Sequence, residues 1–267
     1  MKYNLYQRNF LRVFFKLSAL PLDYLKAFLY KNTNLHHFVL FSDAFTKRQR
    51  SIVANEVPFY NKLTVKEKRV FEHRVLRFIR SHTFVGREDL RVTERMQLLI
   101  SATAVMITFG FRRYLLSRFE TILVYPQHYF SNITQQLHKG EANPKYKTLV
   151  FSWEDFEEGI KIEDDNLNLG IHELTHALHF SFLTERTYTA RQFLRNYKRL
   201  LAALTDKDAQ KRLIKVNYLR EYAFENQYEF LSVLIEHFFE TPEEFRAKLP
   251  HMYNNVKRML NMNVADF

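Results

Sequence analysis

The chain has 267 residues, with 40 lysines and arginines against 29 aspartates and glutamates, and it contains no cysteine. Without cysteine there is no disulfide framework, no thiolate metal site and no cysteine nucleophile, so any metal must be held by histidine or carboxylate side chains. The formal net charge of +11 raises the question of nucleic acid, an anionic membrane surface or an acidic partner. Glycine and proline are scarce, with 5 and 6 residues, which predicts long uninterrupted helices.

The first 50 residues carry most of the excess positive charge, with nine Lys or Arg and only two Asp. We expect residues 1–50 to form a basic, helical N-terminal extension and residues 51–267 to form one domain. No apolar run reaches the roughly 18 residues of a membrane-spanning helix, and no signal-peptide pattern is present, so we expect a cytoplasmic protein. The extension fits either an amphipathic helix on a membrane surface or a helix packed on the body with its basic side chains solvated.

Local patterns predict mostly helix, with β-structure in the middle of the chain. Thr64 and Glu67 form a capping box that opens the first predicted helix. The glycines and prolines cluster between Pro126 and Gly170, which predicts an irregular or β-containing part there. The predicted helices are residues 64–82, 93–109, a segment from Asp165 or Asn166 through Phe180, 190–216 with a turn near Thr205, and 220–240; the predicted strands are residues 122–125 and 147–151.

An acidic stretch follows the second predicted strand. Eight acids and one base lie between Glu154 and Glu173. We interpret residues 154–165 as an acidic loop that either favours a free amino terminus or basic side chains of a substrate, or is simply solvated.

The strongest chemical pattern is His172-Glu173-Leu174-Thr175-His176, an H-E-x-x-H run. Residues i and i+4 lie on one face of a helix, so both imidazoles can reach a single Zn²⁺. Glu173 then lies beside the open position of the metal, where it can take a proton from a zinc-bound water. The alternative is a buried helix with two surface histidines and an accidental glutamate.

A catalytic zinc needs a third protein ligand. Position 182 is Phe182, so no third histidine follows at the spacing of the longer H-E-x-x-H motif. We therefore expect a carboxylate from the 220–240 helix, which offers Glu225, Glu229 and Glu236. Glu229 has apolar neighbours that draw it inward, where a carboxylate is costly unless it is paired or bound to metal; a solvated glutamate is the alternative.

Several separate motifs together resemble one family, the zinc-dependent peptidases of the Mlc titration factor A type, which are related in their catalytic part to anthrax lethal factor. The resemblance runs from about Val57 to about Leu249. Its motifs are Val57-Pro58, residues 64–69, residues 122–126 with Phe130, residues 149–155, Asn168 before the His172–His176 run, and Tyr222-Ala223 through Glu229-Phe230 to Phe238-Phe239.

The resemblance implies an α+β, predominantly helical, zincin-like fold with a small β-sheet and a gluzincin-like site. It implies that His172 and His176 bind zinc, that Glu173 is the general base and that Glu229 is the third ligand. Tyr222 matches a tyrosine that donates a hydrogen bond to the developing oxyanion. Seven residues separate Tyr222 from Glu229, so both can face the metal if the segment stays helical; otherwise Tyr222 is a core tyrosine.

The sequence also departs from the family pattern. Thr175 stands where a small residue is usual, and His179 stands where Asp is usual. His179 is then a surface residue, a partner of the metal ligands or an adventitious ligand. The 149–153 run resembles the edge strand that aligns an extended peptide in such peptidases; its alternative is a core strand.

These patterns predict a zinc metallopeptidase that acts on a peptide or protein substrate, with an aminopeptidase-like mode as one interpretation. The alternative is a regulatory binding protein that sequesters a transcriptional repressor, with the zinc site secondary. No nucleic-acid-binding motif accompanies the basic charge, so no specific nucleic acid is expected. Membrane-surface contact through residues 1–50 remains a third interpretation.

Overall fold

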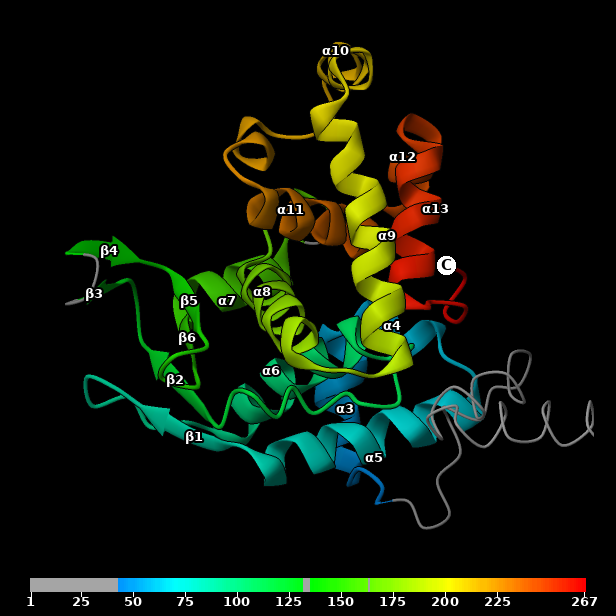
Figure 1. Cartoon of the computed structure of the whole chain (residues 1–267). Helices are drawn as coiled ribbons and strands as arrows, with labels where there is room; N and C mark the ends of the chain where they lie inside the picture. Colours follow the sequence, from blue (N-terminus) through cyan, green and yellow to red (C-terminus); the bar gives the residue numbers. More distant parts are fainter. Residues whose placement is uncertain (1–42, 132–134, 163) are drawn as a thin grey trace, which may run out of the picture.

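The computed structural model of the chain describes residues 43–131, 135–162 and 164–267. The expected N-terminal extension lies outside these residues except for 43–50. The described helices are α3 Lys47–Glu56, α4 Pro58–Lys62, α5 Val65–Ser81, α6 Glu94–Ile107, α7 Trp153–Lys161, α8 Leu169–Thr184, α9 Tyr188–Thr205, α10 Lys207–Val216, the 3₁₀ turn η2 Glu221–Phe224, α11 Gln227–Glu240, α12 Pro242–Lys248 and α13 Pro250–Leu260. The described strands are β1 Thr83–Gly86, β2 Thr121–Tyr125, β3 Tyr129–Ser131, β4 Gln136–His138, β5 Gly140–Asn143 and β6 Thr148–Ser152. The expected α+β, mainly helical class is confirmed (Figure 1).

The main sheet has four strands in the order β1-β2-β6-β5. Strands β1, β2 and β6 are parallel, and β5 runs antiparallel to β6. The predicted strands at 122–125 and 147–151 are therefore β2 and β6, while β1 was not predicted. The interpretation of residues 149–153 as an edge strand is wrong, because β6 lies between β2 and β5 and its residues 149–152 are buried. The edge strand on this side is β5.

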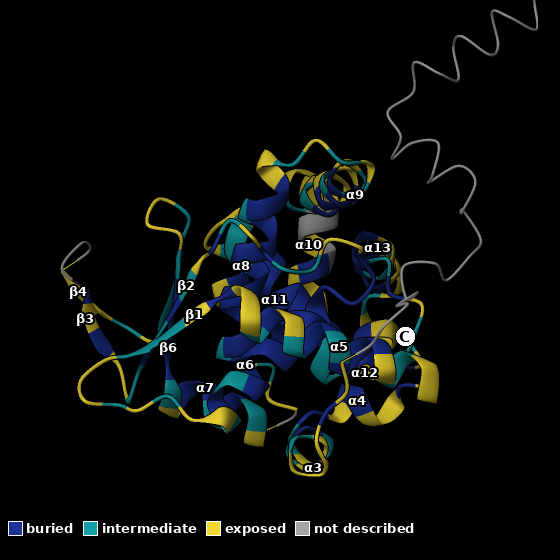
Figure 2. Cartoon of the chain, turned by 90° about the horizontal axis from the view of Figure 1, so that it is seen from below, coloured by how far each residue is buried: buried dark blue, intermediate teal, exposed yellow. Residues whose placement is uncertain are grey.

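Helices pack on the sheet and on one another around a phenylalanine-rich core. Helix α8 lies against β5, β6, α6 and α11, and α8 and α11 are dark blue over much of their surface in Figure 2. The largest fully buried side chains among the described residues are all phenylalanines. Burial of such side chains supplies the main driving force for the fold, and it fixes α8 and α11 side by side.

The helix starts predicted at Thr64 and Thr93 are confirmed, whereas α3 and α4 were not predicted. Thr64 and Glu67 form the predicted capping box of α5, and Thr93 caps α6. Residues 190–216 form two helices, α9 and α10, with the predicted turn at Asp206. The acidic loop expected at 154–165 is wrong, because residues 153–161 form the helix α7, capped by the Ser152 side chain.

Two boundaries near the metal-ligand candidates differ from expectation. Helix α8 is capped by Asn168, whose side chain accepts a hydrogen bond from the Ile171 N–H, and not by Asp165 or Asn166. The continuous helix expected at 220–240 is also wrong. The 3₁₀ turn η2 ends at Phe224, and Asn226 caps a new helix by accepting from the N–H groups of Tyr228 and Glu229.

Candidate metal centre

The fold brings three side chains of the predicted metal site together. His172 and His176 lie one turn apart on α8, with their Nε2 atoms 3.2 Å apart. Glu229 comes from the first turn of α11, and its carboxylate lies 2.9 Å from Nε2 of His172 and 3.6 Å from Nε2 of His176. One ligand atom from each of the three residues falls within 4.8 Å of the others, which is the geometry of a small-cation site.

The ligand atoms are arranged as a cation requires. Nδ1 of His172 lies 2.8 Å from Glu236 and donates its proton there, so a cation that replaced the proton on Nε2 would find the Nε2 lone pair directed toward Glu229. Oε2 of Glu229 accepts no hydrogen bond in the described part of the chain, although it is buried and 2.9 Å from that nitrogen. Two facing lone pairs need a positive charge between them, and a His, His, carboxylate set without cysteine fits Zn²⁺.

The pKa values of His172 and Glu229 also indicate that this group of side chains attracts positive charge. Burial disfavours the charged form of His172, but the adjacent carboxylates of Glu229 and Glu236 outweigh it and, with no cation bound, raise the His172 pKa to about 10. Burial alone raises the pKa of the Glu229 carboxyl, but the adjacent His172 and His176 imidazoles outweigh it and hold this pKa well below its usual range. The carboxylate of Glu229 is therefore ionised over the whole neutral range, as a metal ligand must be.

A buried carboxylate, Glu236, orients the first imidazole. Its side chain is almost fully buried; it accepts the His172 Nδ1 hydrogen bond and two hydrogen bonds from Arg220, both at 2.9 Å. The backbone N–H of Asn168 donates to it at 3.2 Å. A carboxylate on the far nitrogen of a metal-binding imidazole fixes the ring and its tautomer. Glu236 was one of three candidates for the third ligand, and the structure gives it this orienting position instead.

The second imidazole has a weaker partner, Ser232. Its Oγ donates to the backbone carbonyl of His172 at 3.2 Å and lies 3.5 Å from Nδ1 of His176. Ser232 and Arg220 were both missed by sequence reasoning. A signal existed for Glu236, because a glutamate inside the apolar run 233–238 must find partners, but nothing local pointed to Arg220.

Glu173 lies next to the ligands and under the edge strand. It is 7% exposed, and burial raises the pKa of its carboxyl even though both neighbouring histidines lower it. Gly140, the first residue of β5, comes so close that a Cβ there would stand 2.7 Å from Cγ of Glu173. The strand edge therefore passes directly over this carboxylate, and only glycine allows the approach.

Tyr222 reaches the same region from η2 although the helix is broken. Its ring centroid lies 5.9 Å from that of His172, and the Arg220 guanidinium lies 5.6 Å from the Tyr222 ring. Burial and the Glu229 carboxylate raise the pKa of Tyr222 above its ordinary value, which keeps the hydroxyl protonated and able to donate. The residue is 40% exposed, so it faces the open side of the site and is not a core tyrosine.

His179 is neither a surface residue nor part of the ligand cluster. It is 3% exposed and packs against Tyr197 and Tyr228, with ring centroids 4.8 and 5.4 Å away. Burial lowers its pKa to about 4, so the ring is neutral. The surface interpretation is therefore wrong, and His179 belongs to an aromatic cluster behind α8.

Two of the four acids of α7, Asp155 and Glu157, are paired with bases of the chain itself. Asp155 lies 2.7 Å from Nζ of Lys139 and 2.9 Å from Nε2 of His128. Glu157 pairs with Arg95 at 2.6 Å and with Lys161 at 3.0 Å. These pairs leave less negative charge for a substrate than the composition of residues 154–173 suggests.

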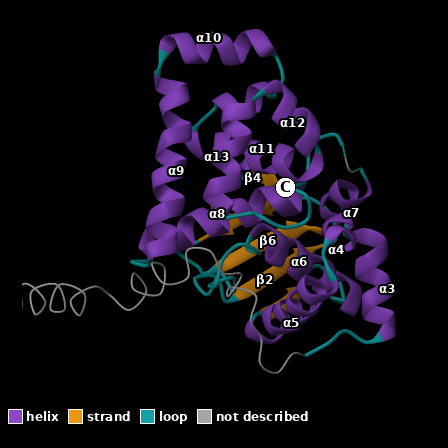
Figure 3. Ribbon diagram, turned by 90° about the vertical axis from the view of Figure 1, so that its right-hand side faces the viewer, coloured by secondary structure: helices purple, strands orange, loops and turns teal. Residues whose placement is uncertain are grey.

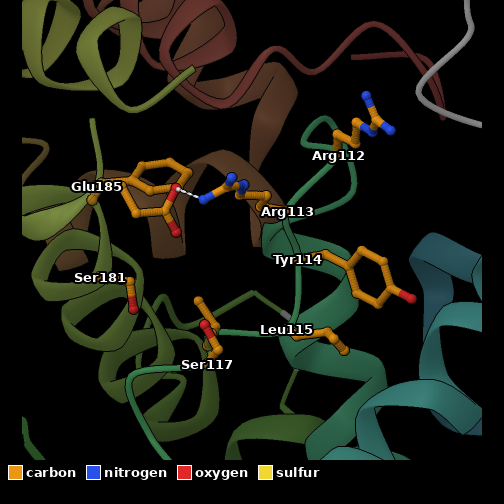
Figure 4. Close-up of a pocket in the computed structure, with 9 residues that line it drawn as sticks. Arg112, Arg113, Tyr114, Leu115, Ser117, Ser181 and Glu185 are labelled. Atoms are coloured by element: carbon orange, nitrogen blue, oxygen red, sulfur yellow. Dashed lines mark ion pairs between the residues drawn. The ribbon is translucent and has the colours of Figure 1, made fainter. Parts of the chain in front are cut away.

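A pocket of about 300 Å³ lies elsewhere, between the loop after α6 and the C-terminal end of α8 (Figure 4). Arg113 in this pocket faces Glu185, with Nη1 and Oε2 3.7 Å apart. None of the proposed ligands lines it, so it is separate from the metal centre.

Comparison with known protein families gives a match over most of the chain. The model of the glucose-regulated metallopeptidase M90 family matches residues 31–260. The chain belongs to this family. The chain is therefore a metallopeptidase-type protein. Proteins of this type use a metal ion and act on peptides or proteins. The matched range is wider than residues 57–249, where the motifs were found, and it includes part of the basic N-terminal segment.

A second comparison matches an uncharacterized protein of Synechocystis sp., slr2042. The two chains are 23% identical over 241 residues, which cover 82% of this chain and 85% of the relative. The M90 assignment therefore carries the functional information. Among the described residues, no helix is both long and apolar enough to cross a bilayer.

Proposed function

We propose that this M90 protein hydrolyses peptide bonds with a zinc ion held by His172, His176 and Glu229. The observation that carries the proposal is the convergence of these three ligand atoms within 4.8 Å, beside the buried carboxylate of Glu173. When bound, zinc supplies a Lewis acid that polarises a carbonyl and lowers the pKa of a water ligand toward neutrality.

Side chains of the protein carry out the other parts of the hydrolysis. Glu173 accepts the proton of the attacking water and passes it to the leaving amine; its raised pKa, caused by burial, suits a group that must both take and return a proton. Tyr222, protonated at neutral pH, donates a hydrogen bond to the carbonyl oxygen as that atom becomes negative. Glu236 and Ser232 hold the two imidazoles in place throughout.

The substrate backbone binds along β5. This strand ends the sheet order, so its outer N–H and C=O groups are available for an added extended strand. Gly140 sets the distance between this strand and Glu173. A peptide paired with β5 therefore runs past the general base, which supports the role expected of an edge strand although the strand is not β6.

An aminopeptidase mode is supported by Glu141, the next residue of β5. Its carboxylate accepts hydrogen bonds from Asn143 at 2.7 Å and from Tyr129 at 3.3 Å, and no cationic side chain of the described residues pairs with it. A carboxylate next to the general base without a cation of its own suits the ammonium of a substrate amino terminus. Glu141→Gln and an N-acetylated peptide should each raise KM; equal cleavage of free and acetylated peptides indicates an endopeptidase.

The test of the function is Glu173→Gln in the zinc-loaded protein. The variant should keep equimolar zinc after dialysis and lose about 10²–10⁴-fold in turnover, the range that a general base contributes. Glu158→Gln, an exposed residue of α7, is the matched control and should hydrolyse as the wild type does. Unchanged turnover in Glu173→Gln removes Glu173 from the mechanism.

A further inference from the structure

The positive charge of the chain is concentrated in a second place besides the N-terminal segment. Residues 186–220 hold ten Lys or Arg and only two acids. Since residues 51–267 together have a balance of only +4, the rest of that range is net negative. The interpretation that the basic charge belongs mainly to residues 1–50 is therefore incomplete, because α9 and α10 are as basic.

On α9 the bases share one exposed face. At about 100° per residue, Arg191, Arg195, Lys198 and Arg199 fall within roughly a 100° arc, and all four are exposed. Tyr188, 39% exposed, falls within the same arc. The opposite face of α9 carries Phe193, Tyr197 and Leu200, which are buried.

Helix α10 repeats this arrangement. Lys207, Lys211 and Lys215 follow at four-residue steps and are exposed, and Ile214, 61% exposed, lies on the same face. Leu213 is 7% exposed and anchors the other face. Figure 3 shows α10 lying across the end of α9 at the periphery of the molecule. No ion pair with a carboxylate is formed by the α10 lysines within the described part of the chain.

This pattern favours an anionic membrane surface over other kinds of partner. Exposed lysines around an exposed isoleucine, on an outward face of a peripheral helix, fit the interface of an anionic bilayer, where phosphates attract the bases and the apolar side chain enters the acyl boundary. A nucleic acid gains from the lysines but not from Ile214, and an acidic peptide needs a groove that these convex faces do not provide. We propose that α10, assisted by the basic face of α9, docks the protein on an anionic membrane surface.

The experiment is co-sedimentation of the full chain with vesicles of phosphatidylcholine alone or mixed with equal phosphatidylglycerol, at low and high salt. The wild type should bind only the anionic vesicles and lose binding at high salt. Lys211→Glu with Lys215→Glu should weaken partitioning roughly tenfold or more. Lys66→Glu with Arg69→Glu on α5 changes the net charge equally and should leave binding in place.

The Ile214→Ser variant distinguishes membrane binding from nucleic-acid binding. It should reduce vesicle binding several-fold without changing the charge, and it should leave any binding to duplex DNA unaltered. Residues 1–42 are present in every variant, so differences between variants report on α10. The proposal is overturned if the α10 double variant binds vesicles as the wild type does, or if the wild type binds duplex DNA and not vesicles. Circular dichroism confirms that each variant is folded.

Discussion

The candidate metal centre and the α9–α10 pair differ in how their charged side chains are arranged. In the centre, Glu236 is buried and Glu229 is half-buried, and each carboxylate lies within 3 Å of a ring nitrogen of His172. On α9 and α10 the charged side chains described are exposed and, apart from Asp208 on α10, positive. Buried charge is tolerated only when geometry satisfies it, so it marks a site of chemistry, whereas exposed charge of one sign acts over the Debye length and marks a surface of association.

The largest expected effect comes from removing a ligand. His176→Ala leaves only His172 and Glu229, too few for a catalytic zinc. We expect loss of zinc on dialysis and no measurable hydrolysis, as read by metal analysis and peptide turnover. The paired substitution on the basic helices, Lys198→Ala, should change neither. If His176→Ala retains equimolar zinc, the ion is held elsewhere.

The next effect tests the buried partner of His172. Glu236→Gln keeps the shape of the side chain but removes the charge that meets both His172 and Arg220. Zinc affinity should fall about 10–100-fold, as is usual for partners of metal ligands. Competition with a chelator measures this directly. Wild-type affinity in this variant means that Glu236 serves Arg220 and the helix start, and not the metal.

A third effect concerns the close approach of β5. Gly140→Ala places a Cβ 2.7 Å from Cγ of Glu173 and 3.0 Å from Leu169. Glu173 must shift, and a displacement of about 1 Å can cost on the order of 10²-fold in rate. We expect kcat to fall while zinc content stays equimolar. A variant with normal kcat shows that Glu173 tolerates displacement.

Two helix N-caps, one in each region, allow their contributions to the free energy of unfolding to be compared. Asn168→Ala and Thr187→Ala each remove an N-cap, of α8 and of α9, which costs about 0.5–2 kcal/mol. Asn168 also donates to the Gly159 carbonyl and to Glu240, so its loss leaves further buried groups unpaired. Urea unfolding should therefore show the larger destabilisation for Asn168→Ala; equal losses would mean that these extra bonds contribute nothing.

The smallest effect is a pH dependence from Glu240. Burial, then the nearby Glu236 and Asp165 charges, raise the pKa of Glu240 to about 8 against the hydrogen bond from Asn168. The folded pKa lies above the unfolded value of about 4.3, so the folded state binds more protons and stability falls as pH rises between these values. Glu240→Gln should flatten this slope in urea unfolding at pH 6 and pH 9. A slope equal to that of the wild type assigns it to another group.

Local signals were sufficient for much of the fold. The capping box of α5, the helix start at Thr93, the turn near Thr205 and the strands β2 and β6 depend on neighbours in the sequence, so they could be predicted. The start of α8 could not. Asp165, Asn166 and Asn168 are all good caps, and the choice depends on Glu236 and Glu240, some 70 residues away.

The candidate site, like the fold, could be predicted only in part. The spacing of His172 and His176 and the family motif at Glu229 named the residues that the fold brings together. The break at Asn226 could not be seen, because both sides of it have helical patterns and the cap competes with them only locally. The role of Arg220 could not be predicted, because its partners, Glu236 and the Asn166 carbonyl, come from other parts of the chain.

The most direct test of the central claim is anomalous diffraction at the zinc edge from crystals of the full chain with equimolar zinc. We expect one strong peak bound by Nε2 of His172, Nε2 of His176 and the Glu229 carboxylate, with Glu236 on Nδ1 of His172. A peak bound by other residues, such as His128 with Asp155, or no peak after zinc loading, would contradict it.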